Sequence, residues 1–256
     1  MIFKLNFLDK KLTILTNSLI LKDYIENGLN LLFLKDKIPD HLTFSFILKN
    51  PSDSQEVLKA FIRLESKILR IIKDNYFIFH ASAFSFNGKA TMVLGDAGSG
   101  KSSLCFLAGL WGGKILTDEP VLIEKKSFKI LPFRYLIKIT DFRKNFSSLK
   151  WDFKQNRIIE KNYEFNIFTK QDLKRLNINL EYRSLYLKNI IFLEEKKYDN
   201  LLHLTKHWIH PKRKLLKSLN ELIKEKNISF IPDFTYNLKN KKSLRDLKRM
   251  VLCLKN

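Results

Sequence analysis

One short loop constrains the fold of this chain more than any other feature. The chain has eight glycines, and four of them, Gly88, Gly95, Gly98 and Gly100, stand close together in the first half of the sequence. The stretch that begins at Gly95 reads GDAGSGKS and fits the pattern G-x-x-x-x-G-K-[ST] at every position. An apolar run, ATMVL, precedes it, and a helix-like segment, KSSLCFLAGLW, follows it. The pattern therefore predicts a strand, a glycine loop and a helix within an α/β fold.

A loop of this kind binds phosphate through its backbone. Glycine adopts positive φ angles without steric cost, so successive N–H groups can converge on one anion. The helix that begins near Lys101 adds its own unpaired N–H groups and its positive dipole end. We expect the Lys101 ammonium to reach the β- and γ-phosphates, and the Ser102 hydroxyl to take one place on Mg²⁺. The predicted nucleotide-binding residues are Gly95, Asp96, Ala97, Gly98, Ser99, Gly100, Lys101, Ser102 and Ser103.

Ionisable residues flank the loop on both sides. His80 lies upstream, in the apolar segment YFIFHASAFSF, which we expect to be one strand. A two-residue turn at Asn87-Gly88 would join this strand to the strand of the loop and bring His80 near the phosphates. Downstream, the apolar run KILT ends in Asp118-Glu119. Two adjacent carboxylates suit two tasks, since one can bind a metal while the other takes a proton from an attacking hydroxyl.

The remaining elements are predicted from hydrophobic periodicity. The runs FKLNF, LTILTN, LNLLFL and LTFSFIL indicate strands, with a short helix near Leu21–Ile25. An amphipathic helix capped within Ser52–Ser54 follows, with apolar residues spaced by three and four at Val57, Phe61, Leu64, Ile68 and Ile71. We expect a strand-rich N-terminal lobe over residues 1–75 and a nucleotide-binding domain over residues 76–256.

The C-terminal part gives fewer signals. NIIFLEE indicates a buried strand, and the tail indicates two helices, Pro211–Lys226 and Ser243–Leu254, separated by the short extended segment ISFIPDF. Residues 134–188 mix aromatic, basic and polar segments and give no clear periodicity. By sequence proximity, Arg134, Lys138 and Arg143 are candidates for a groove that binds the phosphate acceptor.

The chain carries a formal net charge of +21, but its lysines are spread along the whole sequence. We therefore expect solvated helix faces at PKRKLLK and LKNKKSLRDLKR and an acidic partner, rather than a nucleic-acid groove. No apolar run reaches the roughly 18 residues that cross a bilayer, and charges interrupt the apolar residues of the start. We expect no membrane attachment, a cytoplasmic location, and buried side chains for Cys105 and Cys253.

The order H-A-S, N-G-K, G-x-x-G-x-G-K-S and G-G-x-x-x-x-D-E resembles that of the HPr kinase/phosphorylase-like proteins, which have a phosphoenolpyruvate-carboxykinase-like fold. The resemblance is good from Phe77 to about Ile123 and returns faintly in NIIFLEE and ISFIPDFTYNL. Ser103 stands where the bifunctional enzymes have glutamate, and their glycine- and arginine-rich segment is not recognisable. The resemblance is therefore to a smaller relative rather than to the bifunctional enzyme.

This resemblance implies a role for each flanking residue. Asp118 would be the base that accepts the proton of a substrate hydroxyl, and His80 would assist it. Glu119, in place of a second aspartate, would bind Mg²⁺ together with Ser102. The implied activity is an ATP- and Mg²⁺-dependent kinase acting on a hydroxyl, a serine of a peptide or small protein, and relatives of this kind often form homo-oligomers.

Three alternatives stay open at the level of the sequence. NIIFLEE imitates a Walker B strand, so Glu194 or Glu195 would polarise water in a conventional P-loop ATPase. A nucleotide-binding regulatory protein without transfer activity is equally compatible with the loop. The third concerns a metal: His203, His207 and His210 have a helical spacing that suits zinc, although no carboxylate accompanies them in a motif and the adjoining Lys206 is cationic.

Overall fold

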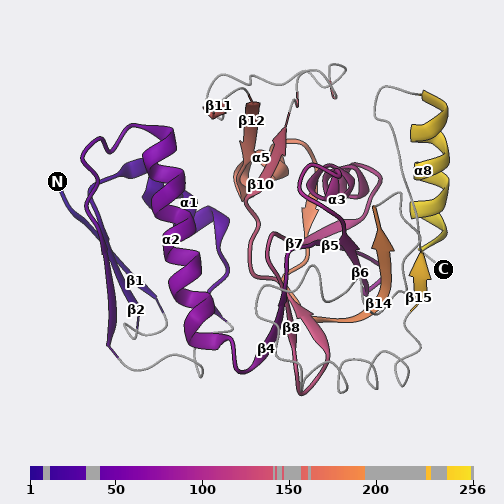
Figure 1. Cartoon of the computed structure of the whole chain (residues 1–256), viewed down its shortest axis with the longest axis horizontal. Coiled ribbons are helices and arrows are strands. Elements are labelled where there is room, and N and C mark those ends of the chain that lie inside the picture. The colour runs from indigo at the N-terminus through magenta and orange to yellow at the C-terminus, as the bar shows by residue number, and fades with distance from the viewer. Residues whose placement is uncertain are drawn as a thin grey trace.

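Figure 1 shows a computed structural model of the chain. It describes residues 1–7, 12–32, 41–140, 142, 146, 157–160, 163–193, 229–231 and 241–254. This part of the chain is a mixed α/β fold, with a large mixed sheet, two three-stranded sheets and helices packed against them. The α/β class expected from the sequence is confirmed, while the phosphoenolpyruvate-carboxykinase-like fold stays a prediction.

The largest sheet has nine strands within the described ranges. Its path runs in the order β13 (Asn179–Leu180), β7 (Lys114–Asp118), β5 (Ser82–Phe86), β6 (Lys89–Leu94), β14 (Leu185–Phe192), β9 (Lys129–Leu131), β8 (Val121–Glu124) and β4 (Tyr76–Phe79), and β15 (Ser229–Ile231) pairs with β14 off this path. β14 is parallel to β6, whereas β5 is antiparallel to both β6 and β7. The C-terminal ends of β6, β7 and β14 therefore lie at the same edge of the sheet.

The sheet curls, so that its two ends share a core. Phe77 and Phe79 of β4 are buried in the same cluster as Leu116 of β7, although β4 and β7 stand near opposite ends of the strand order. These strands bury nearly every position, which explains why their sequences read as continuous apolar runs without alternation.

The hairpin that leads to the glycine loop is confirmed. Asn87 and Gly88 adopt φ angles of 47° and 77°, as a two-residue turn between twisted strands requires, and β5 pairs antiparallel with β6 across it. The expectation of a single strand over YFIFHASAFSF is wrong. β4 pairs with β8, whereas β5 pairs with β6 and β7, so the chain changes neighbours at His80-Ala81. The segment contains neither glycine nor proline, so its sequence carries no sign of such a change.

Helix α3 (Lys101–Leu110) lies between two sheets. On one side it packs against β5 and β7 of the large sheet, and on the other against β10 (Ile137–Thr140). β10 belongs to a small antiparallel sheet with β12 (Tyr163–Phe168) and β11 (Arg157–Glu160). Phe106 of α3 contacts the rings of Phe142 and Phe168 at centroid distances of 5.4 and 5.2 Å. The helix that starts at the glycine loop is thus held on both sides.

Two more helices complete this half of the fold. α5 (Lys170–Arg175) follows β12 and is capped by Thr169 and Asp172, which form a capping box. α8 (Lys241–Cys253) places Leu247 and Val251 in the buried cluster that surrounds α3. α8 agrees with the second helix predicted for the tail, whereas Pro211–Lys226 lies outside the described residues. Cys105 is buried as expected, but Cys253 is exposed, because it lies on the solvent side of an amphipathic helix.

The N-terminal segment forms a three-stranded sheet and two helices, at the left of Figure 1. The strands are β1 (Phe3–Phe7), β2 (Leu12–Thr16) and β3 (Leu42–Phe46), and the helices are α1 (Leu19–Gly28) and α2 (Ser54–Ile72). α1 is longer than expected because Ser18 caps it, accepting a hydrogen bond from the amide of Leu21. The strand predicted over LNLLFL is not present in residues 29–32, where Leu29 makes only an isolated bridge to Arg134.

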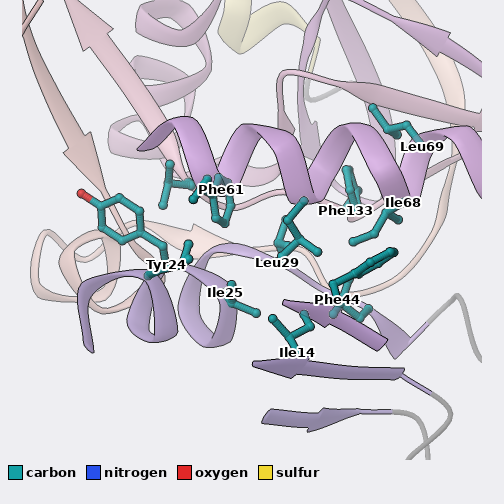
Figure 2. Close-up of a cluster of buried hydrophobic side chains, with 14 of the residues drawn as sticks. Ile14, Tyr24, Ile25, Leu29, Phe44, Phe61, Ile68, Leu69 and Phe133 are labelled. Atoms are coloured by element: carbon teal, nitrogen blue, oxygen red, sulfur yellow. The ribbon is translucent and has the colours of Figure 1, made fainter. Parts of the chain in front are cut away.

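The long helix α2 follows the predicted periodicity. Asp53 caps it within the expected range by accepting a hydrogen bond from the amide of Gln55, and its apolar side chains are buried at Val57, Phe61, Leu64 and Ile68. Figure 2 shows Ile68 of α2 beside Phe133, which comes from the chain after β9, and Phe61 farther along the same helix. The same cluster includes Ile78 of β4 and Leu122 of β8. The core beneath α2 is therefore built from both sides of residue 75, and the division there stays a prediction.

None of the helices in the described ranges has the length and apolar content needed to cross a membrane.

Truncation of Ile68 tests whether this shared core stabilises the fold. Ile68 is 1% exposed beneath α2, whereas Ile62 on the same helix is 45% exposed. We expect Ile68→Ala to lower the free energy of unfolding by about 2–5 kcal/mol, because it leaves a cavity in a packed core. Ile62→Ala is the matched control and should change it by less than about 0.5 kcal/mol. Urea unfolding followed by circular dichroism measures both, and equal effects would contradict the packing described here.

Candidate functional site

The glycine loop, residues 95–100, joins the end of β6 to the start of α3. Gly98 and Gly100 have φ angles of 82° and 100°, in the left-handed region that favours glycine. Gly95 is required for another reason, since a Cβ atom there would lie 2.3 Å from Ser99 Oγ and 3.1 Å from the backbone oxygen of Leu193. The loop can fold this closely only because side chains are missing where its segments meet.

Two polar groups are buried at the loop. The Ser99 hydroxyl is buried and finds no hydrogen-bond partner among the residues that the structure describes. The side chain of Lys101 is only 4% exposed, and its Nζ atom donates to the backbone oxygens of Gly95 and Asp96 at 3.0 and 3.1 Å. The same Nζ lies 3.3 Å from Glu119 Oε1. The ammonium group is thus enclosed between the loop and the acidic pair.

Asp118 ends β7 and is buried beneath the start of α3. Its Oδ1 atom accepts hydrogen bonds from the hydroxyls of Ser82 and Ser102, the latter at 2.9 Å, and its Oδ2 lies 3.5 Å from the amide of Lys138. Burial, with the neighbouring charge of Glu119, raises the pKa of Asp118 to about 6 despite these hydrogen bonds and the nearby Arg134. Such a carboxyl group can exchange a proton near neutral pH.

Glu119 has the opposite electrostatic character. Its Oε1 atom lies 2.9 Å from His80 Nε2 as well as 3.3 Å from the Lys101 ammonium. Burial acts to raise the pKa of Glu119, but the hydrogen bond and charge of His80, with the charges of Lys101 and Arg134, outweigh it and lower the pKa to about 2. Two adjacent carboxyl groups therefore differ widely in basicity, which lets one hold cations while the other accepts a proton.

The structure brings the predicted site residues together, with two changes of partner. The prediction was that Ser102 and Glu119 bind the same metal ion, but the Ser102 hydroxyl donates a hydrogen bond to Asp118. His80, expected beside the base Asp118, contacts Glu119 instead. Both differences follow from strand register: Ser82 lies opposite Asp118 in the β5–β7 pair, so Asp118 points under α3 and the next residue points toward His80.

Three residues contribute to the site in ways that the sequence did not indicate. Ser82 donates to Asp118, Arg134 contacts the segment around Glu119, and Glu65 of α2 pairs with Arg134. Arg134 was expected in an acceptor groove, which is wrong, because its side chain is buried and bound to Glu65 and Glu119. The alternation of a strand that starts just after His80 could have indicated Ser82, but no local pattern marks Glu65.

Only some of the other predicted residues lie in the part of the chain that the structure describes. The Lys138 side chain is half-buried, with its Nζ atom 3.7 Å from the centre of the Phe165 ring. Arg143, the pair Glu194-Glu195 and the histidines 203, 207 and 210 lie outside the described residues.

The residues that can hold a metal are the oxygen donors next to the loop. Within the described ranges, no group of three or more His, Cys, Asp and Glu side chains is arranged to hold a metal ion by itself. Mg²⁺ is commonly bound by one or two carboxylates and a hydroxyl, with substrate phosphates and water completing the shell. Ser102, Asp118 and Glu119 supply donors of this type.

The fold and site define a class: a mixed α/β protein with a glycine loop between a strand and a helix, faced by an acidic pair. No protein-family model matches the sequence, and no curated protein matches it either. Among solved structures, the Hpr(Ser) kinase/phosphatase from Coxiella burnetii is similar, with a TM-score of 0.29 and 14% sequence identity over 58% of this chain and 88% of that one. This is a distant structural relationship, and the function is therefore inferred from the geometry of the site.

Removal of the Ser82 hydroxyl tests the environment of Asp118. A hydrogen bond to the ionised carboxylate lowers its pKa, so Ser82→Ala should raise the pKa of Asp118 from about 6 by on the order of one unit. Ser85→Ala, on the same strand and equally buried, is the control and should leave it unchanged. Carboxyl ¹³C NMR titration measures both values. A fall in the pKa, or equal shifts in the two variants, would contradict the described contact.

Proposed function

We propose that this chain is an ATP- and Mg²⁺-dependent kinase that transfers the γ-phosphate to a hydroxyl, a serine of a peptide or small protein. The observation that carries the proposal is the position of the Lys101 ammonium, which lies between the glycine loop and the acidic pair. A cation placed there can contact the outer phosphates of a nucleotide while the carboxyl groups face the attacking hydroxyl.

The loop has features that suit a triphosphate. Positive φ angles at Gly98 and Gly100 turn its backbone so that amides can converge, and the N-terminus of α3 adds further N–H donors. The buried Ser99 hydroxyl, which finds no partner within the described ranges, is available to donate to a phosphate oxygen. A side chain at Gly95 would collide with Ser99 and Leu193 and so distort the loop.

Mg²⁺ fits the same place, because Ser102 and the two carboxylates are hard oxygen donors beside the loop. The ion would be held by Ser102 and Glu119, whose low pKa keeps it ionised. When bound, Mg²⁺ neutralises charge on the β- and γ-phosphate oxygens.

The chemistry assigned to the chain's own residues is limited to charge and proton handling. Asp118 accepts the proton of the substrate hydroxyl on its carboxylate as the hydroxyl oxygen forms a bond to the γ-phosphorus and the bond to the β–γ bridging oxygen breaks. A pKa near 6 suits this task, since the group is mostly ionised at neutral pH yet basic enough to accept a proton. Lys101 and the loop amides stabilise the negative charge on the transferring group.

A second candidate function is supported by the position of β14. This strand runs parallel to β6, and the amide of Leu193 donates to the backbone oxygen of Leu94 at the start of the loop. Leu193 therefore lies next to the loop, and Glu194 and Glu195 follow it in the sequence, as a Walker B acid of a conventional ATPase would. In that function Glu194 or Glu195 would polarise the attacking water.

Replacement of Lys101 tests nucleotide binding and transfer together. We expect Lys101→Ala to reduce phosphate transfer from labelled ATP by at least about 100-fold, because a cation facing the developing charge is lost. Lys114→Ala, on the exposed start of β7, is the control and should keep full activity. Transfer is measured with Mg²⁺ and a cell extract or serine peptides as acceptor. An active, folded Lys101→Ala protein would disprove the role of this lysine.

Replacement of the two acids separates their roles. Asp118→Asn should bind Mg-ATP within a few-fold of wild type but lose transfer by at least about 100-fold, since the proton acceptor is removed. Glu119→Gln should instead raise the Mg²⁺ concentration needed for half-maximal activity. Calorimetric nucleotide binding and Mg²⁺ titrations of turnover distinguish these outcomes.

The structure also allows Asp118 and Glu119 to have exchanged roles. Because Ser102 contacts Asp118 and His80 contacts Glu119, a Mg²⁺ defect in Asp118→Asn with a transfer defect in Glu119→Gln would exchange the two roles. Hydrolysis lost on changing Glu194-Glu195 but kept in Asp118→Asn would select the ATPase. Nucleotide binding without turnover in any assay would select a regulatory protein.

A further inference from the structure

A buried ion pair connects α2 of the N-terminal segment to the acidic pair. Glu65 and Arg134 are 4% and 8% exposed, and Arg134 Nη1 lies 3.3 Å from Glu65 Oε2. The guanidinium group also lies over the ring of Phe61, one turn earlier on the same helix, at 5.5 Å. Two residues of α2 therefore hold one arginine side chain that comes from the chain after β9.

Arg134 is bound to three consecutive residues, the last two of β7 and the one that follows it. Its amide donates to Thr117 Oγ1 at 3.0 Å, its backbone oxygen accepts from the amide of Asp118 at 2.8 Å, and its Nη1 donates to the backbone oxygen of Glu119 at 2.6 Å. Only the last of these bonds depends on the side chain. The guanidinium group thus fixes the peptide at which the chain turns away from Asp118.

The geometry of the Glu65–Arg134 ion pair adds little to the stability of the fold but suits the orientation of the Arg134 side chain. A single nitrogen, Nη1, serves both Glu65 and the Glu119 carbonyl, while Glu65 Oε1 and Arg134 Nε are buried without a partner in the described part of the chain. A pair selected for strength would use two parallel hydrogen bonds. Buried ion pairs contribute little net stability, because both charges lose their hydration. Burial also raises the pKa of Glu65 to about 7, although the charge of Arg134 opposes this shift.

We propose that Glu65 and Arg134 are positioning residues through which α2 sets the place of Asp118 and Glu119 opposite the glycine loop. This inference rests on the proposed function in one respect, since the acids must act there for their position to affect turnover. Glu65 holds the nitrogen that holds the Glu119 carbonyl, and Glu119 in turn contacts His80 and Lys101. Displacement of catalytic groups by about 1 Å can cost a reaction about 100-fold in rate.

Three variants test whether Glu65 and Arg134 position the acidic pair. Glu65→Gln removes the charge that orients the guanidinium, and Arg134→Met removes the donor to Glu119. The double variant Glu65→Leu/Arg134→Met removes both buried charges together, so we expect it to fold even if a single variant does not. The matched control is Glu56→Gln, on the same helix, whose carboxylate accepts hydrogen bonds from the amides of Lys49 and Asn50.

Two kinds of measurement are combined. We expect amide hydrogen exchange at Asp118 and Glu119 to become about tenfold faster in all three variants but not in Glu56→Gln, with protection of β2 and β14 unchanged. We expect turnover to fall by about 10- to 100-fold while the dissociation constant for Mg-ATP changes less than about threefold. Arg134→Lys, which keeps a donor, should retain more turnover than Arg134→Met.

Unchanged exchange at residues 117–119 in both Glu65→Gln and Arg134→Met would overturn the inference. So would a loss of turnover that only follows a loss of nucleotide binding, or one that Glu56→Gln shows equally. If the wild-type protein binds nucleotide but transfers and hydrolyses nothing, the proposed function fails, and the exchange measurement still decides whether α2 positions this segment.

Discussion

The site depends on one constraint: the buried ammonium of Lys101 must be surrounded by oxygen atoms. Two backbone carbonyls of the glycine loop and the carboxylate of Glu119 meet this need, and they come from segments on either side of α3. Burial of a cation is costly unless such partners are in place. The end of β7 therefore has to lie against the loop. The packing of α3 between two sheets holds the loop and the end of β7 in place.

The strand order explains why this meeting occurs at one edge of the sheet. β5 lies between β6 and β7 and is antiparallel to both. The C-terminal ends of β6 and β7 therefore lie at the same edge of the sheet, on either side of the start of β5. Ser82 stands at that start and bonds to Asp118. β14, parallel to β6 on its other side, ends beside the loop as well. Ligands of open α/β sheets bind at the C-terminal ends of parallel strands, and this edge combines three of them.

Local patterns predicted the parts of the site that are local. The glycine loop, the turn at Asn87-Gly88 and the helix α2 follow from residues close in sequence, and the structure agrees with each. The partners of His80 and Ser102 could not be predicted, because they depend on the register between β5 and β7. Glu65 and Arg134 are separated by 69 positions, and no pattern in the sequence links them. Only the fold brings them into one buried contact.

A bound nucleotide would disturb the balance of charges around the acidic pair. Three carboxyl groups, Glu65, Asp118 and Glu119, lie near two cations, Lys101 and Arg134, and the third basic group is His80. The pKa of Glu65 and of Asp118 is raised by burial and by the neighbouring acids, while that of Glu119, which contacts both Lys101 and His80, is lowered. A nucleotide phosphate would compete with Glu119 for the Lys101 ammonium. Glu119 would then need another cation, which is the place that Mg²⁺ takes in the proposed kinase.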